Sequence, residues 1–447
     1  MAQKQRKTVT VGFLALGCPK NIVDSEKMLA EIAKSGLVIT AEPDNADVVV
    51  INTCGFIEPA KAEALDAICH AVECKARGTV KKIIVAGCLP QRLGQQLLND
   101  VPGIDSVVGL GQRDNIAKII KKTLACKQRL AYLEHWPKKC GDDTGRLLIT
   151  GRHSAYLRIS EGCNHRCSFC TIPTIRGRFR SKPMHRILTE ATELVRSGVA
   201  ELNVIAQDTT HYGRDLKMKN GLAKLINELE KITGVIWIRL MYLWPAGIDY
   251  QLIDTIAASK KILHYLDIPI QHVNNKILKA MRRPDTKDHL RRLIEKLRGA
   301  IPDIVLRTTL IVGFPGETDK QFAELLDFIK WAEFDALGCF QFYAESGTAA
   351  AAMPRQVPQP IKEQRLEELM LTQQKIVFAK NKNRIGQKLL CLVDSVEDKG
   401  IGRARFYGQA PKVDSICIIK NCSATAGEFI STEVVDTKGY DLMVRQI

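Results

Sequence analysis

The sequence predicts an α/β protein made of three successive domains, and two observations lead to this prediction. Apolar runs of strand length alternate twice with helical patterns along the chain, and they then give way to short runs at hairpin spacing. We place the domains at residues 8–120, 153–380 and 381–447, with a linker over 121–152. A chain of 447 residues has room for several domains, since a domain typically takes roughly 100–200 residues.

The first domain is predicted to be an open parallel sheet with helices on its faces. Strand patterns each precede a helical pattern, with strands at 9–16, 47–53 and 82–86 and helices at 22–35, 59–75 and 91–99. This βα repeat is typical of parallel sheets, because parallel strands need a crossover connection. The segment that follows, up to residue 152, is basic and broken by proline and glycine, as in a linker.

The second domain repeats the alternation with six strand candidates, at residues 154–160, 201–207, 236–243, 265–270, 305–312 and 337–343. Helical patterns lie between them, for example over 187–197, 286–299 and 321–332. Six strand–helix units fit a partial parallel (βα)6 barrel. The chemistry of such a barrel lies at the carboxyl ends of its strands, so its site residues are expected there.

The third domain follows a charged amphipathic helix over 361–383. It contains five short apolar runs, at 389–396, 402–407, 415–419, 428–435 and 441–444. Runs of this length at hairpin spacing predict a small antiparallel β-barrel.

The composition argues against a membrane protein. Hydrophobic residues make up 45% of the chain, the mean hydropathy is −0.08, and no apolar run approaches the roughly 18 residues that span a bilayer. The N-terminus resembles a secretory leader, with basic residues through Lys7, an apolar stretch over 9–16 and then Cys18. That stretch is short and β-rich, so we interpret it as a buried strand and expect a cytoplasmic protein with reduced thiols.

Fourteen cysteines are too few for a disulfide scaffold at this length and more than a cytosolic enzyme usually carries. Three of them, Cys163, Cys167 and Cys170, follow the first predicted strand of the partial barrel with the spacing C-x-x-x-C-x-x-C. Zinc sites normally close with a fourth ligand, whereas a cubane iron–sulfur cluster can use three thiolates and leave one iron open to a substrate. The spacing therefore favours an iron–sulfur cluster.

A second group consists of Cys18, Cys54 and Cys88, which are far apart in sequence. Each lies one or two residues past a predicted strand of the first domain, and the carboxyl ends of such strands gather at one edge of an open sheet. This placement predicts a second three-thiolate cluster; three small buried core cysteines are the alternative. The other eight cysteines have no second cysteine at chelating spacing in a suitable loop, and we assign them no role.

The segment EGCNHRCSFCTIP resembles the signature of the radical S-adenosylmethionine (SAM) superfamily. Together with LGCPKNIVDSE, INTCGFIEPA and AGCLPQR, and over about residues 8–445, the chain resembles the methylthiotransferase family within it. The resemblance implies a radical SAM barrel, a terminal TRAM domain, and two 4Fe-4S clusters. It makes six cysteines the expected catalytic and metal-binding residues: Cys163, Cys167 and Cys170 for the SAM-binding cluster, and Cys18, Cys54 and Cys88 for an auxiliary cluster.

The resemblance also implies a reaction. The open iron would chelate SAM, and reductive cleavage would yield a 5′-deoxyadenosyl radical that abstracts hydrogen from an unactivated carbon. Two SAM molecules would be consumed per turnover, one as methyl donor to a sulfide on the auxiliary cluster and one as the source of the radical. An external electron donor and a sulfur source would be further partners.

Two motifs indicate the branch of the family. Cys18 is followed by Pro-Lys-Asn, and the second barrel strand ends in the sequence IAQDTT, which contains Gln207 and Asp208. Both resemble the RimO branch, which inserts a methylthio group at the β-carbon of an aspartate in ribosomal protein S-twelve, free or in the small subunit. The alternatives are a methylthiotransferase acting at C2 of a tRNA adenosine and, from another class, a non-catalytic iron–sulfur protein that binds RNA.

The placement of charge bears on this choice. The net charge is +16, but residues 381–447 hold ten basic and eight acidic residues. A TRAM domain that grips tRNA should be strongly basic, because phosphate neutralisation dominates affinity. The nearly neutral domain favours a protein substrate, while the basic remainder of the chain allows contact with rRNA near the target.

Residues outside the cysteine motif are also expected to contact SAM: Phe169, Ile172, Gln207, Asp208, Arg239 and Gln271. The first two flank the last cluster cysteine and are expected against the adenine, with packing at the barrel mouth as the alternative. The resemblance implies that Gln207 and Asp208 contact the SAM amino group, with a solvated pair of loop residues as the alternative. Arg239 lies in an apolar strand, where a charge is costly unless paired, so we expect it to meet the SAM carboxylate. Gln271, just past the fourth predicted strand, is expected to contact SAM for the same reason.

Overall fold

The computed structural model describes residues 8–133, 140–398 and 400–447, so residues 134–139 of the predicted linker lie outside it. The chain divides into two compact units. The first comprises Met1–Ile149, Glu161–Asn164 and Thr171–Arg186, and the second comprises Thr150–Ser160, His165–Cys170 and Ile187–Ile447. No helix in the described part of the chain is long and apolar enough to cross a membrane.

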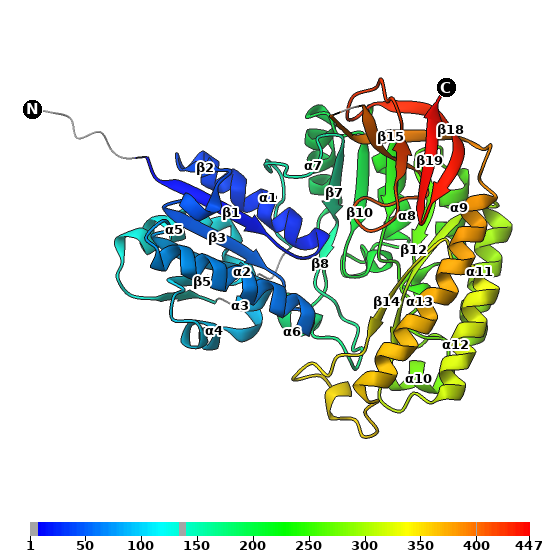
Figure 1. Cartoon of the computed structure of the whole chain (residues 1–447), viewed down its shortest axis with the longest axis horizontal. Coiled ribbons are helices and arrows are strands. Elements are labelled where there is room, and N and C mark those ends of the chain that lie inside the picture. The colour runs from blue at the N-terminus through cyan, green and yellow to red at the C-terminus, as the bar shows by residue number, and fades with distance from the viewer. Residues whose placement is uncertain (1–7, 134–139, 399) are drawn as a thin grey trace, which may run out of the picture. The chain divides into compact units, whose positions relative to one another are not determined.

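The first unit contains a parallel sheet of six strands (Figure 1). In spatial order they are β2 (Val38–Thr40), β1 (Thr10–Ala15), β3 (Val48–Thr53), β4 (Lys82–Gly87), β5 (Ser106–Val108) and β6 (Leu130–Tyr132). Strand β3 has the sequence VVVINT and is buried at every position, as expected for a central parallel strand covered on both faces. The strand order reverses between β1 and β3, which makes this position the topological switch point of the sheet.

Helices cover both faces of this sheet. The first unit contains α1 (Pro19–Lys34), η1 (Pro43–Asn45), α2 (Glu58–Ala76), α3 (Cys88–Leu93), α4 (Gln95–Asp100), η2 (Leu110–Asn115), α5 (Ile116–Ala125) and α6 (Ile172–Arg176). One hydrophobic cluster packs α2 and α4 on one face, and a second packs α1 and α5 on the other. Helix α1 begins with proline, whose fixed φ suits the first turn of a helix.

The predicted open parallel sheet is confirmed, with three strands more than its patterns indicated. Strands β2, β5 and β6 have three residues each, which is too short for a periodicity to emerge from the sequence. Strand β6 lies within the segment predicted as a linker. It pairs with β5, so the sheet extends past residue 120. The two-residue strands β8 (Ser160–Glu161) and β9 (Arg180–Ser181) lie farther along the chain.

The second unit begins with six parallel strands that lie side by side in their order along the chain. They are β7 (Ser154–Arg158), β10 (Glu201–Ile205), β11 (Trp237–Leu240), β12 (Ile262–Asp267), β13 (Val305–Val312) and β14 (Ala336–Gln341). This open curve of strands confirms the predicted partial barrel. The connecting helices are α7 (Met184–Arg196), η3 (Thr209–His211), α8 (Gly221–Glu230), η4 (Pro245–Gly247), α9 (Tyr250–Ala258), α10 (Asn275–Ala280), α11 (Lys287–Ala300), α12 (Asp319–Ala332), η5 (Ala350–Ala352) and α13 (Gln359–Lys382).

A closed five-stranded barrel completes the second unit. It consists of β15 (Lys388–Glu397), β16 (Ile401–Phe406), β17 (Cys417–Ile419), β18 (Phe429–Lys438) and β19 (Asp441–Gln446). The prediction of a wholly antiparallel barrel needs one correction, because β17 and β19 pair in parallel to close it. All the other pairs are antiparallel.

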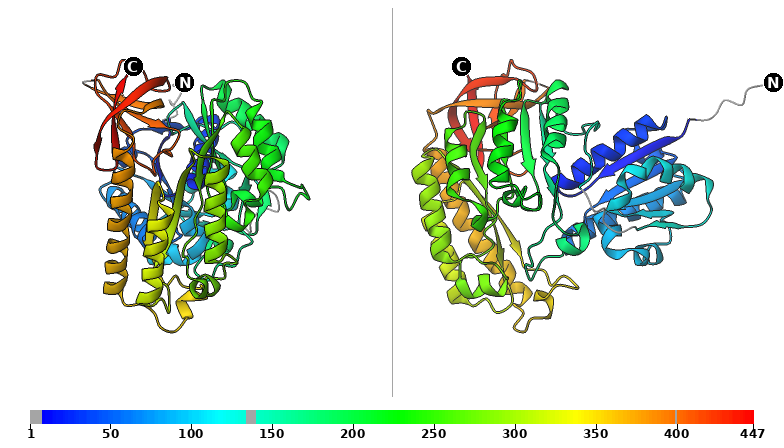
Figure 2. Two further views of the ribbon diagram at one scale, coloured as in Figure 1. Left: turned by 90° about the vertical axis from the view of Figure 1, so that its right-hand side faces the viewer. Right: turned by 180° about the vertical axis from the view of Figure 1, so that it is seen from behind.

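The C-terminal barrel packs on the amino ends of the six-stranded sheet. Asp414 of the barrel accepts hydrogen bonds from Tyr265 of β12 (2.8 Å) and from Arg307 of β13 (3.2 Å). Figures 1 and 2 show the barrel, in orange to red, at the same end of the sheet from three sides. The carboxyl ends of the strands therefore remain the end at which chemistry is expected.

Candidate active site

Three cysteines meet at the carboxyl edge of the first sheet. Cys18 is the N-cap of α1 just beyond β1, Cys54 directly follows β3, and Cys88 directly follows β4 as the first residue of α3. Strands β1, β3 and β4 are neighbours, with Ala15 paired to Asn52 and Thr53 paired to Gly87. The three thiols therefore come to the switch point from three separate loops.

Two glycines show how closely these loops approach one another. A methyl group added at Gly17 would lie 2.8 Å from Cys54 Cβ and 3.5 Å from its Sγ. A methyl group added at Gly55 would lie 3.1 Å from the carbonyl carbon of Cys88. Gly17 also has a φ of +90°, which side chains rarely adopt. The glycines thus allow the three cysteine loops to touch.

The thiols influence one another electrostatically. Burial raises the pKa of Cys54, and a negative charge on Cys18 raises it further. Burial also raises the pKa of Cys88 to about 12; the Arg176 cation opposes this, and charges on Cys18 and Cys54 add to it. Several thiolates cannot form in this space without a strong positive charge among them, and a metal centre supplies that charge. The donor set therefore fits a metal cluster bound by three thiolates.

Arg176 is a charged partner of this edge that no motif in the sequence indicated. One of its Nη atoms donates to Cys88 Sγ at 3.4 Å, to Asn21 Oδ1 at 2.6 Å and to Asp24 at 3.1 Å. The other donates to both carboxylate oxygens of Glu161, at 3.1 and 3.2 Å. Its partners lie up to 155 residues away, so no local spacing could have revealed them.

The three-cysteine loop follows β7 and β8. Within the first unit, the backbone N–H of Cys163 donates to the carbonyl of Gly177 at 3.1 Å. Within the second unit, a tight turn joins the other two cysteines, since the Cys170 N–H donates to the Cys167 carbonyl at 3.2 Å. Ser168 anchors the turn through its Oγ, which donates to the carbonyl of Ala280 at 2.8 Å. Each of the three cysteines is half-buried, as a ligand open to a co-substrate should be.

A stack of side chains supports this turn. Arg283 hydrogen-bonds the sulfur of Cys167 and lies 3.9 Å above the ring of Trp244. The Trp244 ring stacks on His165 at 3.7 Å with an angle of 9° between the planes. His165 Nε2 lies 2.6 Å from Asp208 Oδ2. The stack therefore connects a predicted cluster ligand to a predicted SAM contact.

Charge is balanced within the stack. Burial raises the pKa of Cys167, and the Arg283 guanidinium opposes that rise. Burial would also raise the pKa of Asp208, but hydrogen bonds from His165 and Thr210 outweigh it and hold that pKa below its usual value. Asp208 is therefore an anion at neutral pH, placed just beyond the carboxyl end of β10.

Comparison with known families finds three matches along the chain. Residues 10–109 match a family described as "Uncharacterized protein family UPF0004", residues 157–329 match the radical SAM superfamily, and residues 385–447 match the TRAM domain. A protein of Syntrophomonas wolfei named ribosomal protein uS12 methylthiotransferase RimO is 43% identical over 97% of this chain and 99% of its own length. Proteins of the same name from Geobacter sulfurreducens and Clostridioides difficile are both 42% identical over 97% of this chain, and over 97% and 98% of their own lengths.

The chain belongs to the RimO family. The predicted resemblance to radical SAM methylthiotransferases is therefore confirmed. Two solved structures share the fold at low sequence identity. The radical SAM methyltransferase TsrM from Kitasatospora setae superposes with a TM-score of 0.55 at 12% identity, covering 74% of this chain and 73% of its own. The cobalamin-dependent radical enzyme OxsB does so with a TM-score of 0.52 at 16% identity, covering 83% of this chain and 56% of its own.

In this RimO family member, several predicted SAM contacts lie near the barrel mouth. Asp208 and the half-buried Gln207 follow β10. Gln271 has a φ of +68° and bridges to β13, with its N–H donating to the Thr309 carbonyl at 2.9 Å. Phe169 packs against a buried hydrophobic cluster that includes Phe314. This agrees with the alternative that its ring is part of the packing at the barrel mouth. A separate case is Ile172, which starts α6 in the first unit and is half-buried.

The expectation for Arg239 is wrong. Its side chain is 0% exposed, and Nε and one Nη donate to Oε1 of Glu201 at 3.1 and 3.0 Å. The other Nη donates to the carbonyl of Tyr407, in the C-terminal barrel, at 2.6 Å. Glu201 is the first residue of β10, so the guanidinium points to the amino end of the sheet, away from the cysteine loop. The charge is paired, as its burial required, but with protein groups instead of SAM.

Proposed function

We propose that this protein is a radical SAM methylthiotransferase that inserts a methylthio group at the β-carbon of an aspartate in ribosomal protein uS12. Two lines of support meet in one chain. Relatives that carry this name match it over nearly its whole length. The observation that carries the proposal is the convergence of Cys18, Cys54 and Cys88 at one sheet edge, in a chain that also has the motif C-x-x-x-C-x-x-C.

Each set of thiols would hold one 4Fe-4S cluster. Cys163, Cys167 and Cys170 provide three ligands, which leaves one iron free for SAM. When bound, this cluster supplies the electron that cleaves SAM and so makes hydrogen abstraction possible, while the auxiliary cluster on the other three cysteines supplies the sulfur. Thiolates gathered within one set repel one another, so each set would need the positive charge of the metal.

The chain's own residues hold and orient the reactants. Arg283 donates to Cys167 and offsets part of its negative charge. Asp208, held ionised by His165, would accept the SAM ammonium, and Gln207 next to it would add a further polar contact. Arg176 donates to Cys88 and offsets negative charge at the auxiliary set. The two cations would offset part of the negative charge of the cluster-bound thiolates.

The partners follow from this reaction. An external electron donor and a sulfur source are needed, and the substrate is uS12, either free or in the small subunit. The protein would act in the cytoplasm, where ribosomes are found. The TRAM domain would touch rRNA only beside the target, because its arginines past residue 400 are used within the protein: Arg403 pairs with Glu397, Arg405 with Glu201 and Asp394, and Arg445 with Glu433.

The same ion pairs weigh against a tRNA substrate. A surface that grips RNA gains affinity by neutralising phosphates, and an arginine already paired with a carboxylate offers less to a phosphate. Residues 381–447 carry only two more basic than acidic residues. We therefore prefer the protein substrate over the tRNA alternative.

Metal content and a product assay test the proposal. Anaerobically reconstituted protein should hold about eight irons per chain, and Cys163→Ala should lower this to about four. The exposed Cys69 lies outside both sets, so Cys69→Ala is the matched control and should keep the full content. An unchanged iron content in Cys163→Ala would reject the two-cluster arrangement.

The substrate is tested by incubating the reconstituted protein with SAM, a reductant, a sulfide source and either uS12 or tRNA. Mass spectrometry should find the methylthio increment on an aspartate of uS12 and none on tRNA. An increment that appears only on tRNA would reject the substrate proposed here while leaving the radical chemistry in place.

A further inference from the structure

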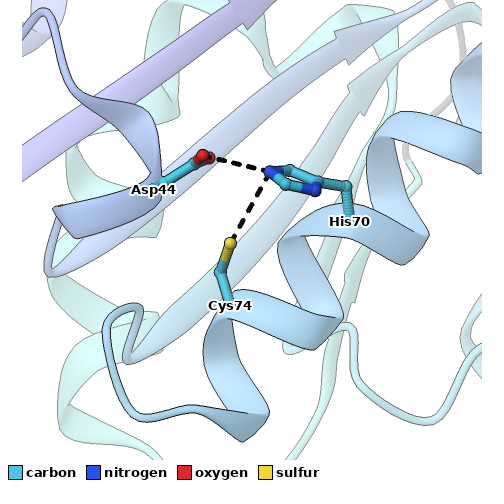
Figure 3. A group of neighbouring side chains, drawn as sticks. All are labelled: Asp44, His70 and Cys74. Atoms are coloured by element: carbon cyan, nitrogen blue, oxygen red, sulfur yellow. Dashed lines mark hydrogen bonds and ion pairs between the residues drawn. The ribbon is translucent and has the colours of Figure 1, made fainter.

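A second group of metal-binding side chains lies in the first unit, apart from both cysteine sets. Asp44 is in η1, and His70 and Cys74 are one turn apart on α2 (Figure 3). Side chains at positions i and i+4 of a helix lie on one face, one above the other. Their ligand atoms all lie within 4.8 Å of one another. No sequence pattern singles out Cys74, because the metal-binding neighbours that it meets here are not cysteines.

The distances fit a tetrahedral zinc ion. His70 Nε2 lies 3.1 Å from Asp44 Oδ2 and 3.7 Å from Cys74 Sγ. A zinc ion with Zn–N and Zn–O bonds of about 2.1 Å and a Zn–S bond of about 2.3 Å would separate these pairs by about 3.4 and 3.6 Å. The same nitrogen faces both partners, as it would if all three atoms were directed at one ion. For these two pairs the spacing needs changes of only a few tenths of an ångström, and all three ligand atoms lie within 4.8 Å of one another.

The charge and exposure of the group suit zinc with one open position. A thiolate and a carboxylate together balance the two positive charges of the ion, and a neutral imidazole completes the set. Cys74 is 0% exposed, whereas the side chains of His70 and Asp44 are 53% and 59% exposed. The ion would therefore rest on the buried sulfur with its fourth position toward solvent. Arg77, which donates to Cys74 Sγ at 3.2 Å, would remain as an outer hydrogen-bond donor to the coordinated sulfur.

We propose that Asp44, His70 and Cys74 form a zinc site with three protein ligands and a solvent-facing fourth position. The site is separate from the auxiliary cysteine set. Helix α2 begins at Glu58, close after Cys54, and Cys74 lies 16 residues farther on, which places it about 24 Å away along the helix axis. The ion would join the segment before β3 to the helix after it, and the loop that it closes includes Cys54. Zinc would thus stabilise the element that carries one auxiliary cysteine.

The test uses the holoenzyme, because vacant cluster cysteines would themselves bind zinc. Reconstituted protein, with its iron content checked before and after, is dialysed anaerobically against zinc sulfate, and bound zinc is measured by mass spectrometry. We expect one zinc per chain in the wild type and at least a tenfold loss of affinity in His70→Ala. Because His70 is largely exposed, that variant should fold, and Cys69→Ser on the same helix should bind zinc like the wild type.

X-ray absorption at the zinc edge gives an independent readout that iron does not obscure. We expect one sulfur and one imidazole among four ligands in the wild type, with the sulfur lost in Cys74→Ser. Equal zinc content in the wild type and His70→Ala would overturn the proposal. So would a zinc spectrum with no sulfur ligand. Neither result depends on whether the enzyme modifies uS12, so the two proposals fail separately.

Discussion

Replacing Glu201 with glutamine should loosen the C-terminal barrel from the six-stranded sheet. Glu201 is 0% exposed and accepts hydrogen bonds from Arg405 at 2.7 and 3.0 Å, from Arg239 at 3.0 and 3.1 Å, and from Ser154 at 2.8 Å. Arg405 lies in β16, so this carboxylate joins the barrel to the start of β10. Glu201→Gln keeps the shape of the side chain and leaves two buried guanidinium groups without their shared anion.

The size of the effect follows from the ionisation of Glu201. Burial alone would raise its pKa, but Arg405 and Arg239 outweigh burial and lower that pKa from 4.5 to about 2. At about 1.4 kcal/mol per pH unit, this difference corresponds to roughly 3 kcal/mol, close to the roughly 3–5 kcal/mol for breaking a buried ion pair. Because the folded pKa is the lower one, this stability is complete above about pH 4.5 and is lost as the pH falls toward 2.

Hydrogen exchange at neutral pH measures this effect locally and spares the acid-labile clusters. Three kcal/mol correspond to roughly a hundredfold change in an opening equilibrium. Backbone amides of β16 and β17 should therefore exchange about a hundredfold faster in Glu201→Gln than in the wild type, while those of β3 should not change. The exposed pair of Glu433 and Arg445 supplies the control, since Glu433→Gln should cost less than about 1 kcal/mol. An effect of Glu201→Gln no larger than that of the control would refute the reasoning.

Two further outcomes are expected. Arg283→Leu removes the cation beside Cys167, so the midpoint potential of the SAM-binding cluster should fall by roughly 60 mV, the one-electron equivalent of about 1.4 kcal/mol. A redox titration followed by electron paramagnetic resonance checks this at constant iron content, and an unchanged potential would contradict the role of Arg283. Gly87→Ala should cost the protein its auxiliary iron, about four of eight, because the φ is +98° and the new methyl group would lie 2.7 Å from the Thr53 carbonyl. Full iron content in that variant would show that the strand end tolerates the change.

Local pattern in the sequence was sufficient for the order of domains and for the strand ends that carry chemistry. The buried run VVVINT of β3 and the proline that starts α1 bracket Cys54 and Cys18 within a residue or two, because strand and helix signals are local. The three-residue strands β2, β5 and β6 were not predicted from the sequence, because their stability comes from pairing with neighbours that lie elsewhere in the chain.

The sequence by itself determined that the chain has six cysteines in loops that follow strands and a charge in the apolar strand β11. Only the tertiary structure decided which groups these residues meet. The order β2-β1-β3-β4 puts Cys18, Cys54 and Cys88 at neighbouring strand ends, and it places Arg176 against Cys88 from a segment 88 residues away. Arg239 shows the limit most clearly. Burial requires a partner for a guanidinium, and its cost is visible in the sequence, but the partner is selected by packing in space, here by Glu201 and a barrel 168 residues farther along the chain.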